Sequence, residues 1–177
     1  MDPQYIVIHA SASSWGTWKD INAWHKQRGW GRKLQPEYAG QWILKYGFLP
    51  TRIHIGYHAV VCNGFPAYGD WDAGNRRPAF DGKIEPGRPD RMPGAHCLGR
   101  NYDSLGVCLI HNPGFDDYTE QQWSSLIHYC ATKIDKHSDL SVEGITQHSV
   151  WDKRKPLCAS LNIDQLQGAV DDKLRGY

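Results

Sequence analysis

The sequence has no long apolar segment, no excess of either charge and no leader-like start. Its longest apolar runs, such as YIVIHA and LGVCLI, are far shorter than the roughly 20 residues of a transmembrane helix. The 20 Lys and Arg residues nearly balance the 19 Asp and Glu residues, so charge favours neither nucleic acid nor an anionic membrane as a partner. The first residues, MDPQYIVIHA, lack the basic and apolar regions of a secretory signal peptide. Any partner must therefore be argued from a specific site.

Paired cysteines are also missing. The five cysteines are an odd number and none forms a C-x-x-C pair, so we expect no disulfide framework and at least one free thiol. Cys62 and Cys108 lie in apolar runs, and Cys130 lies on the apolar side of a predicted helix, which is typical of small buried side chains. Cys158 lacks such a setting because it ends the polar segment QHSVWDKRKPLC.

Strand-like and helix-like segments alternate along the chain. Thr17 with Asp20, and Thr119 with Gln122, have the spacing of capping boxes, which predicts a helix after each threonine. Strands are expected at residues 4–9, 53–61, 104–110 and 142–148, and helices at 18–28, after 119 and from 164. This order, in a chain of 177 residues, predicts one α/β domain over residues 1–177 with a central mixed β-sheet flanked by helices.

Two stretches stand outside this pattern. Residues 31–52 contain a possible short helix at residues 38–46. Residues 65–93 are rich in Gly, Pro, Asp and Arg and have no period of 2 or 3.6, which predicts an ordered loop. Long ordered loops in compact domains are often functional.

The histidines and Cys158 are compatible with a metal site. His148 and Cys158 are of residue types that bind zinc, and His9, at the end of the first predicted strand, is a candidate third ligand. Nine histidines allow many chance trios, so spacing alone leaves structural roles open. Asp152 is either a further ligand or a solvated carboxylate of WDKRK. The histidines expected on helix surfaces or in sheet packing are His25, His54, His58, His128 and His137.

Six segments, taken in order, resemble one family. They are IVIHASAS, WHKQRGW, IGYHAVV, IEPGRPDRMPGAHCLGRNYDSLGVCLI, TEQQWSSL and QHSVWDKRKPLC, and they span nearly the whole chain. Together they resemble the zinc-dependent N-acetylmuramoyl-L-alanine amidases of the phage lysozyme and peptidoglycan recognition protein superfamily. The resemblance implies that His9, His148 and Cys158 are zinc ligands and that Tyr57 is the polar residue beside the metal.

The activity implied by the resemblance is hydrolysis of the amide bond between N-acetylmuramic acid and L-alanine in peptidoglycan. Zinc with an open position lowers the pKa of a bound water and polarises the scissile carbonyl. Tyr57 would hold this water or hydrogen-bond the developing oxyanion; the alternative is a packed strand tyrosine. Because compact phage enzymes resemble the chain most, we expect an endolysin made in the host cytoplasm without a signal peptide and released to the cell wall.

One position departs from the family pattern. Similar phage amidases have a catalytic lysine, or a threonine in some relatives, two residues before the cysteine ligand, where this chain has Pro156. The spacing from His148 to Cys158 is also longer than is usual in the family. We expect Lys155 to reach the site through the longer loop as a catalytic residue, with Lys153 as the alternative; a cation there would stabilise an oxyanion. Equally, the run DKRK fits a solvated surface.

His96 and Asn101, in GAHCLGRN, resemble residues of the family's substrate-binding groove. Their structural alternatives are a turn cap for Asn101 and a packing role for His96. Residues 31–52 and 65–79 resemble insertions relative to the compact phage enzymes. Their aromatic side chains would either line extra groove walls for glycan stacking or pack as structural loops. These aromatic residues are Trp42, Tyr46, Tyr68 and Trp71.

Two further functions follow from the resemblance. Members of the superfamily that lost a zinc ligand bind peptidoglycan without cutting it, and Pro156 is the feature that favours this alternative. Some phage relatives also bind the host RNA polymerase, which makes that enzyme a second candidate partner beside peptidoglycan. The near-neutral charge gives this partner no support.

Overall fold

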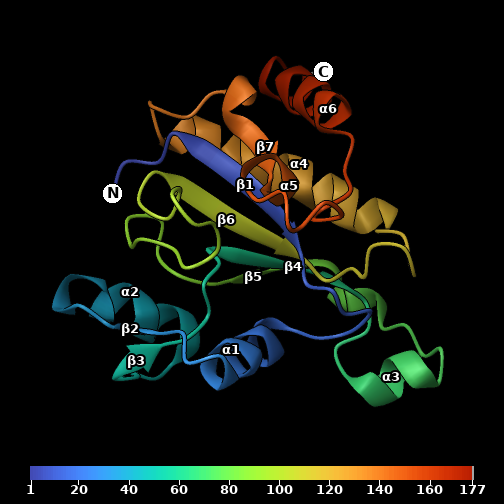
Figure 1. The fold of residues 1–177 in the computed structure, drawn as a ribbon, viewed down its shortest axis with the longest axis horizontal. Coiled ribbons are helices and arrows are strands. Elements are labelled where there is room, and N and C mark those ends of the chain that lie inside the picture. The colour runs from blue at the N-terminus through green and yellow to red at the C-terminus, as the bar shows by residue number, and fades with distance from the viewer. Residues whose placement is uncertain (177) are drawn as a thin grey trace.

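The computed structural model describes residues 1–176, apart from the side chains of Gln41, Lys45 and Tyr46. Five strands form one sheet in the order β5–β4–β6–β1–β7 (Figure 1). The sheet is mixed because β4 and β5 are antiparallel, whereas the other neighbouring strands are parallel. The strands are β1 (Tyr5–Ala10), β4 (Ala59–Asn63), β5 (Asp81–Pro86), β6 (Ser104–Leu109) and β7 (Ile145–Gln147). The predicted α/β domain with a central mixed sheet is confirmed.

Two helices cover one face of the sheet. α4 (Glu120–Lys136) and α6 (Ile163–Leu174) pack against each other on the same side of the strands (Figure 1). Leu126 and Cys130 of α4 and Leu166 of α6 are fully buried in the core on this side. The capping box at Thr119 is present, as predicted. The short η2 (Val142–Gly144) leads into β7, so the last predicted strand begins later than its apolar pattern indicates.

The opposite face is covered by α1 (Trp18–Gln27) and α2 (Pro36–Tyr46). Ile21 and Trp42 from these helices pack with Val60 and Cys108 from the sheet. The capping box at Thr17 is also present, as predicted. α2 lies between β2 (Arg32–Lys33) and β3 (Arg52–Ile53), which form a separate two-stranded antiparallel pair.

The strand predicted over residues 53–61 is wrong in its first half. Residues 54–58 form an irregular segment between β3 and β4. The Gly56 N–H donates to His25 Nδ1, and the Gly56 carbonyl accepts from the Ala95 N–H, so these backbone groups bind other elements instead of a strand. An added Cβ on Gly56 would lie 2.2 Å from the Ala95 carbonyl oxygen, so only glycine permits this approach.

The loop predicted over residues 65–93 is wrong in part. It contains α3 (Tyr68–Asp72), η1 (Pro78–Phe80) and the strand β5. Because β5 lies at the end of the sheet, it accommodates Asp81, Lys83 and Glu85 and a terminal proline. The strand was not predicted because its charged residues break the alternation of apolar and polar positions that indicates a strand.

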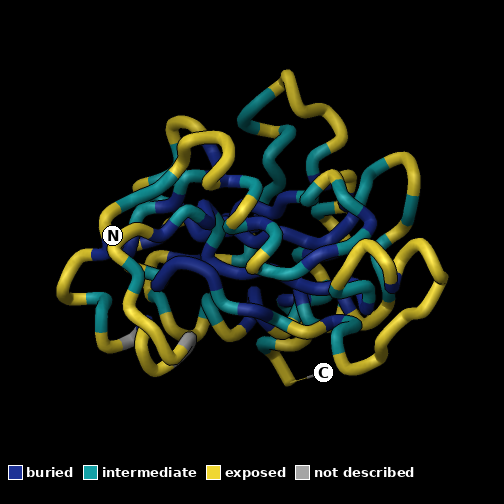
Figure 2. Tube along the Cα trace, turned by 90° about the horizontal axis from the view of Figure 1, so that it is seen from below, coloured by how far each residue is buried: buried dark blue, intermediate teal, exposed yellow. Residues whose placement is uncertain are grey.

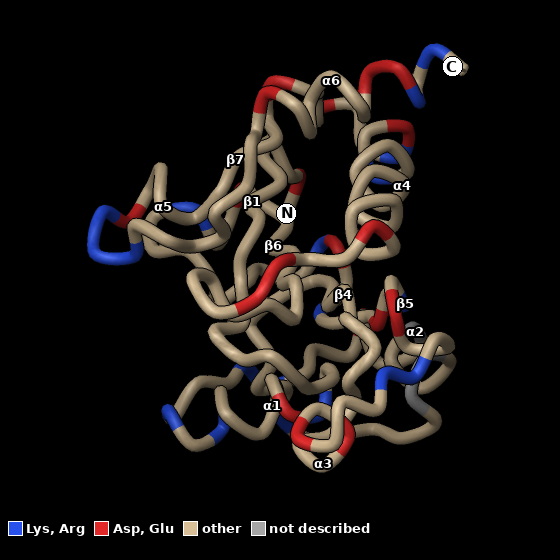
Figure 3. Tube along the Cα trace, turned by 90° about the vertical axis from the view of Figure 1, so that its right-hand side faces the viewer, with Lys and Arg blue, Asp and Glu red and all other residues tan. Residues whose placement is uncertain are grey.

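Burial and charge follow the layered arrangement. Figure 2 shows the buried segments concentrated in the middle of the domain and the exposed segments mainly in its loops. The basic residues that follow α5 (His148–Trp151) lie on a loop that projects from the domain (Figure 3).

Within residues 1–176, no helix has the length and apolar character needed to cross a membrane.

Candidate metal centre

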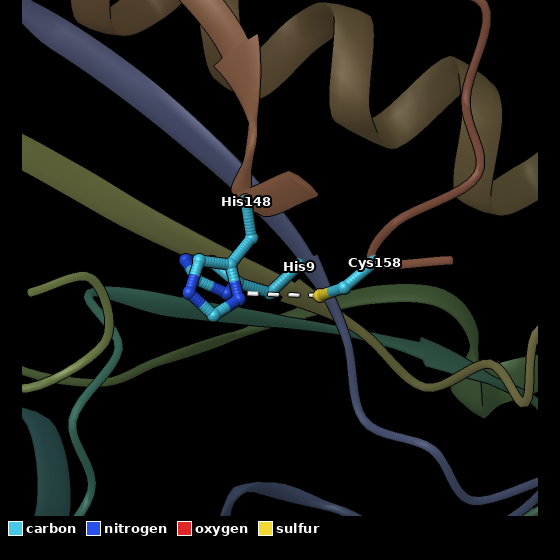
Figure 4. A group of neighbouring side chains, drawn as sticks. All are labelled: His9, His148 and Cys158. Carbon is cyan, nitrogen blue, oxygen red and sulfur yellow. Dashed lines mark hydrogen bonds between the residues drawn. The ribbon is translucent and has the colours of Figure 1, made fainter. Parts of the chain in front are cut away.

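The three predicted ligands lie at one edge of the sheet. His9 is the next-to-last residue of β1, and His148 begins α5 directly after β7. β1 and β7 are paired and parallel, so the ends of these strands lie together. The loop between α5 and α6 brings Cys158 back to the same edge (Figure 4).

The ligand atoms of these residues converge. One atom from each of His9, His148 and Cys158 lies within 4.8 Å of the other two. The Cys158 Sγ is 3.9 Å from His9 Nδ1, and the His9 and His148 ring centroids are 4.5 Å apart. The Ala10 N–H donates to the Cys158 Sγ at 3.3 Å, which holds the cysteine loop against β1.

The protonation states of these residues fit metal binding. Burial lowers the pKa of His9 well below its usual value, and the neighbouring histidines lower it further, so this imidazole is neutral at neutral pH. Burial also lowers the pKa of His148. Burial raises the pKa of the Cys158 thiol, so the charge of a bound cation would be what holds it as a thiolate. Two neutral imidazoles and one thiolate suit zinc with a fourth position left open.

His96 lies directly behind His9. The His96 Nδ1 is 3.0 Å from the His9 Nε2, and both side chains are buried. Since the His9 Nδ1 faces Cys158, we assign the proton to the His9 Nε2, which then donates to His96. The His96 Nε2 lies 3.5 Å from the Ser104 Oγ on its other side. A partner of this kind fixes the orientation and tautomer of a metal-binding histidine.

Asn101 organises the backbone around His96. The Asn101 Oδ1 accepts hydrogen bonds from the N–H groups of His96 and Cys97 at 2.8 and 3.1 Å. This is the capping arrangement expected of a structural asparagine. His96 also lines the cavity beside the candidate ligands, whereas Asn101 does not. A contact of either residue with substrate stays a prediction.

Tyr57 lies beside His9, with the two ring centroids 5.0 Å apart. It is half-buried and lines the same cavity. Burial raises the pKa of Tyr57 well above its usual value, and the Cys108 and Cys158 thiols raise it further. The phenol therefore keeps its proton at neutral pH and can donate a hydrogen bond.

The cavity over the candidate ligands has a volume of about 180 Å³. Lys155 lines it, whereas Lys153 does not. The structure thus brings Lys155 into the same cavity as the candidate ligands, and its catalytic role stays a prediction. Asp152 is also absent from the lining, and its carboxylate pairs with the Arg154 guanidinium at 2.8 Å. Asp152 therefore forms a local ion pair and lies outside the group of converging ligand atoms.

One wall of the cavity was not identified from the sequence. It is formed by side chains of α1 and of the residues just after it. His25, expected on a helix surface or partly buried, is only 4% exposed, and burial together with nearby Arg28 lowers its pKa to about 4. The available signal was the helical spacing that places Ile21 and His25 one turn apart. The side chains of this wall are Ile21, Trp24, His25, Arg28 and Trp30.

The aromatic residues of the two predicted insertions have different surroundings. Trp42 is 2% exposed and packs in the core, which fits the structural alternative. The side chain of Tyr46 lies outside the described part of the chain. Tyr68 and Trp71 are exposed, with ring centroids 5.8 Å apart, and the Tyr68 ring contacts Trp15. Glycan stacking on Tyr68 and Trp71 stays a prediction.

Known proteins are similar to this chain in sequence and in fold. The endolysin of Enterobacteria phage T3 is 25% identical over 169 residues, which cover 89% of this chain and 81% of the relative. The endolysin of Escherichia phage T7 is 26% identical over 143 residues, covering 75% of this chain and 67% of the relative. The solved N-acetylmuramoyl-L-alanine amidase LysC from Clostridium intestinale URNW has the same fold, with a TM-score of 0.67 and 21% identity over 97% of this chain and 87% of that one.

The sequence profile of a single family covers most of the chain. The profile described as N-acetylmuramoyl-L-alanine amidase matches residues 1–158, from the start of the chain to the candidate ligand Cys158. The matched region contains all three candidate metal ligands. The chain therefore belongs to the N-acetylmuramoyl-L-alanine amidase family.

Proposed function

We propose that this protein is a zinc-dependent peptidoglycan hydrolase that cleaves the amide bond between N-acetylmuramic acid and L-alanine. The observation that carries the proposal is the convergence of His9, His148 and Cys158, whose ligand atoms lie within 4.8 Å of one another in the lining of a cavity. These residues come from a strand, a helix and a loop, so their convergence is a property of the fold. Their two nitrogens and one sulfur are ligands that zinc prefers.

Three residues that line the cavity beside the candidate ligands have chemical roles in this proposal. Bound zinc would supply an activated water and polarise the scissile carbonyl. The neutral Tyr57 phenol donates a hydrogen bond to the oxygen on which negative charge develops. The Lys155 ammonium, in another wall of the cavity, stabilises the same charge. His96 holds the His9 ring in the orientation that turns Nδ1 toward Cys158, from which His9 would bind zinc.

The biological setting that we propose is that of a phage endolysin. Endolysins of phages T3 and T7 are among the relatives of this chain. The protein would be made in the host cytoplasm and would act on the peptidoglycan of the host wall after release. The host RNA polymerase stays a predicted second partner, for which no described surface gives specific support.

Analysis of the products released from purified peptidoglycan tests the proposal. Mass spectrometry should detect free stem peptides that begin at L-alanine. A chelator should abolish their release, and added zinc should restore it. Products cleaved between sugars, or activity that a strong chelator leaves unchanged, would contradict the proposal.

The alternative function is a peptidoglycan-binding module without catalysis. Pro156, at the position of the family's catalytic lysine, is the observation that favours it. The presence of all three candidate ligands and of Lys155 in the cavity favours the enzyme. Tight binding to peptidoglycan with no released peptide, in the presence of zinc, would establish the binding module instead.

A further inference from the structure

Arg28 is a cationic residue in the cavity wall that faces the candidate metal centre from α1. It caps the C-terminal end of α1, and its guanidinium lies 5.6 Å from the centroid of the Trp30 ring. Both residues line the cavity together with His9 and Tyr57. α1 lies on the side of β1 opposite α5, so Arg28 and Lys155 approach the cavity from different walls (Figure 1).

The surroundings of Arg28 leave its guanidinium available to an anion. No Asp or Glu lines the cavity, and no salt bridge to Arg28 is found among the described side chains. Stacking on Trp30 restricts the guanidinium without using its planar set of N–H donors. By contrast, many other arginines are paired with aspartates. These arginines are Arg76, Arg77, Arg100, Arg154 and Arg175.

The substrate of the proposed reaction carries an anion at a suitable place. In peptidoglycan, L-alanine is followed by a D-glutamate that continues the stem through its side chain, which leaves its α-carboxyl group free or amidated. This group lies about two residues from the scissile bond, or roughly 7 Å along an extended chain. A guanidinium in the wall beside the metal centre matches the charge and planar shape of such a carboxylate.

We propose that Arg28 binds the free α-carboxylate of the second stem-peptide residue and makes the enzyme prefer stems with a carboxylate over stems with a carboxamide there. This inference rests on the proposed amidase function and adds a specificity-determining residue to it. Arg28 acts on substrate binding, whereas the hydrolytic chemistry belongs to the residues around His9. The preference should therefore be lost without loss of the reaction itself.

Kinetics on two matched substrates test the inference. N-acetylmuramoyl-L-alanyl-γ-D-glutamyl-L-lysine and its analogue with D-isoglutamine at the second position differ only in whether this α-carboxyl group is a carboxylate or a carboxamide. For Arg28→Gln, kcat/KM on the carboxylate substrate should fall about 10- to 100-fold, the range of a lost charge-assisted hydrogen bond, while kcat/KM on the carboxamide substrate should change little. Arg28→Lys keeps the charge but not the planar donor set, and should give an intermediate loss.

Lys26→Gln is the matched control, because Lys26 is an exposed cation in the last turn of α1 that does not line the cavity. It should leave the ratio of the two kcat/KM values as in the unsubstituted protein. An equal loss on both substrates in Arg28→Gln, or an equal shift in Lys26→Gln, would overturn the role of Arg28 while leaving the amidase function in place. Failure of the unsubstituted zinc-loaded protein to cleave either substrate would overturn the proposed function and this inference together.

Discussion

The His9 Nε2 and the His96 Nδ1 lie 3.0 Å apart in the interior, so the innermost candidate ligand is held by a second histidine. The two residues are 87 positions apart in the chain. The contact requires both the strand that ends near His9 and the loop that precedes β6.

Removing this contact should weaken zinc binding without removing a ligand. We expect His96→Ala to reduce zinc affinity about 10- to 100-fold, because His9 loses the acceptor that fixes its orientation. His96→Asn keeps an acceptor at a position similar to Nδ1 and should lose less. Competition with a chromophoric chelator measures both affinities. Equal affinities for the two variants and the unsubstituted protein would show that His96 does not orient His9.

Loss of the thiol at Cys158 should release the metal. We expect Cys158→Ser to lose most bound zinc, because a neutral hydroxyl replaces the only sulfur among the three candidate ligands. Elemental analysis after dialysis gives the metal content. Cys97→Ala is the control, since Cys97 lies outside the candidate ligand set and should leave the zinc content unchanged. Full zinc content in Cys158→Ser would mean that another residue is the third ligand.

Lys155 should affect turnover and not metal binding. We expect Lys155→Ala to lower kcat about 100-fold, because the cavity loses a cation that stabilises developing negative charge. Its zinc content should equal that of the unsubstituted protein. Lys153→Ala is the matched control, because Lys153 lies on the same loop but does not line the cavity. A large loss of kcat in Lys153→Ala alone would show that the other lysine serves the site.

Asp90 should make stability depend on pH in the acid range. Burial raises its pKa, but Lys133, Lys136 and His137, which all contact the carboxylate, lower it by more, so the net pKa is well below the usual range. A carboxylate whose pKa is lower in the folded state stabilises the fold above its unfolded-state pKa of about 3.9. The contribution is lost as the pH falls through the lower, folded-state pKa.

We expect Asp90→Asn to reduce the free energy of unfolding by about 1 to 3 kcal/mol at neutral pH, because it leaves the partly buried Lys133 without its counter-ion. The difference from the unsubstituted protein should shrink from about pH 4 downwards. Urea unfolding at several pH values measures it. Asp135→Asn, an exposed aspartate of α4, should change stability by less than about 0.5 kcal/mol. If the difference in unfolding free energy between Asp90→Asn and the unsubstituted protein stayed constant down to low pH, the lowered pKa of Asp90 would be contradicted.

Local sequence rules predicted where two of the main helices begin, and the resemblance to one family identified the candidate ligands. The capping boxes at Thr17 and Thr119 lie within a few residues of the chain and need no tertiary partner, so the starts of α1 and α4 were predictable. His9, His148 and Cys158 were predicted because they occur in segments that resemble one family. Their chemistry, nitrogen and sulfur ligands with a free position, follows from the side chains themselves.

Only the tertiary structure decided how these residues meet and what surrounds them. The parallel pairing of β1 with β7 brings His9 close to His148. A hydrogen bond from the Ala10 N–H to the Cys158 Sγ holds the cysteine beside them. The irregular segment around Gly56 and the charged edge strand β5 depend on partners distant in sequence, which alternation cannot reveal. The cavity wall formed by α1 could not be predicted either, because it depends on elements distant in sequence. The spacing of residues along a helix identifies a face but not the element that lies opposite it.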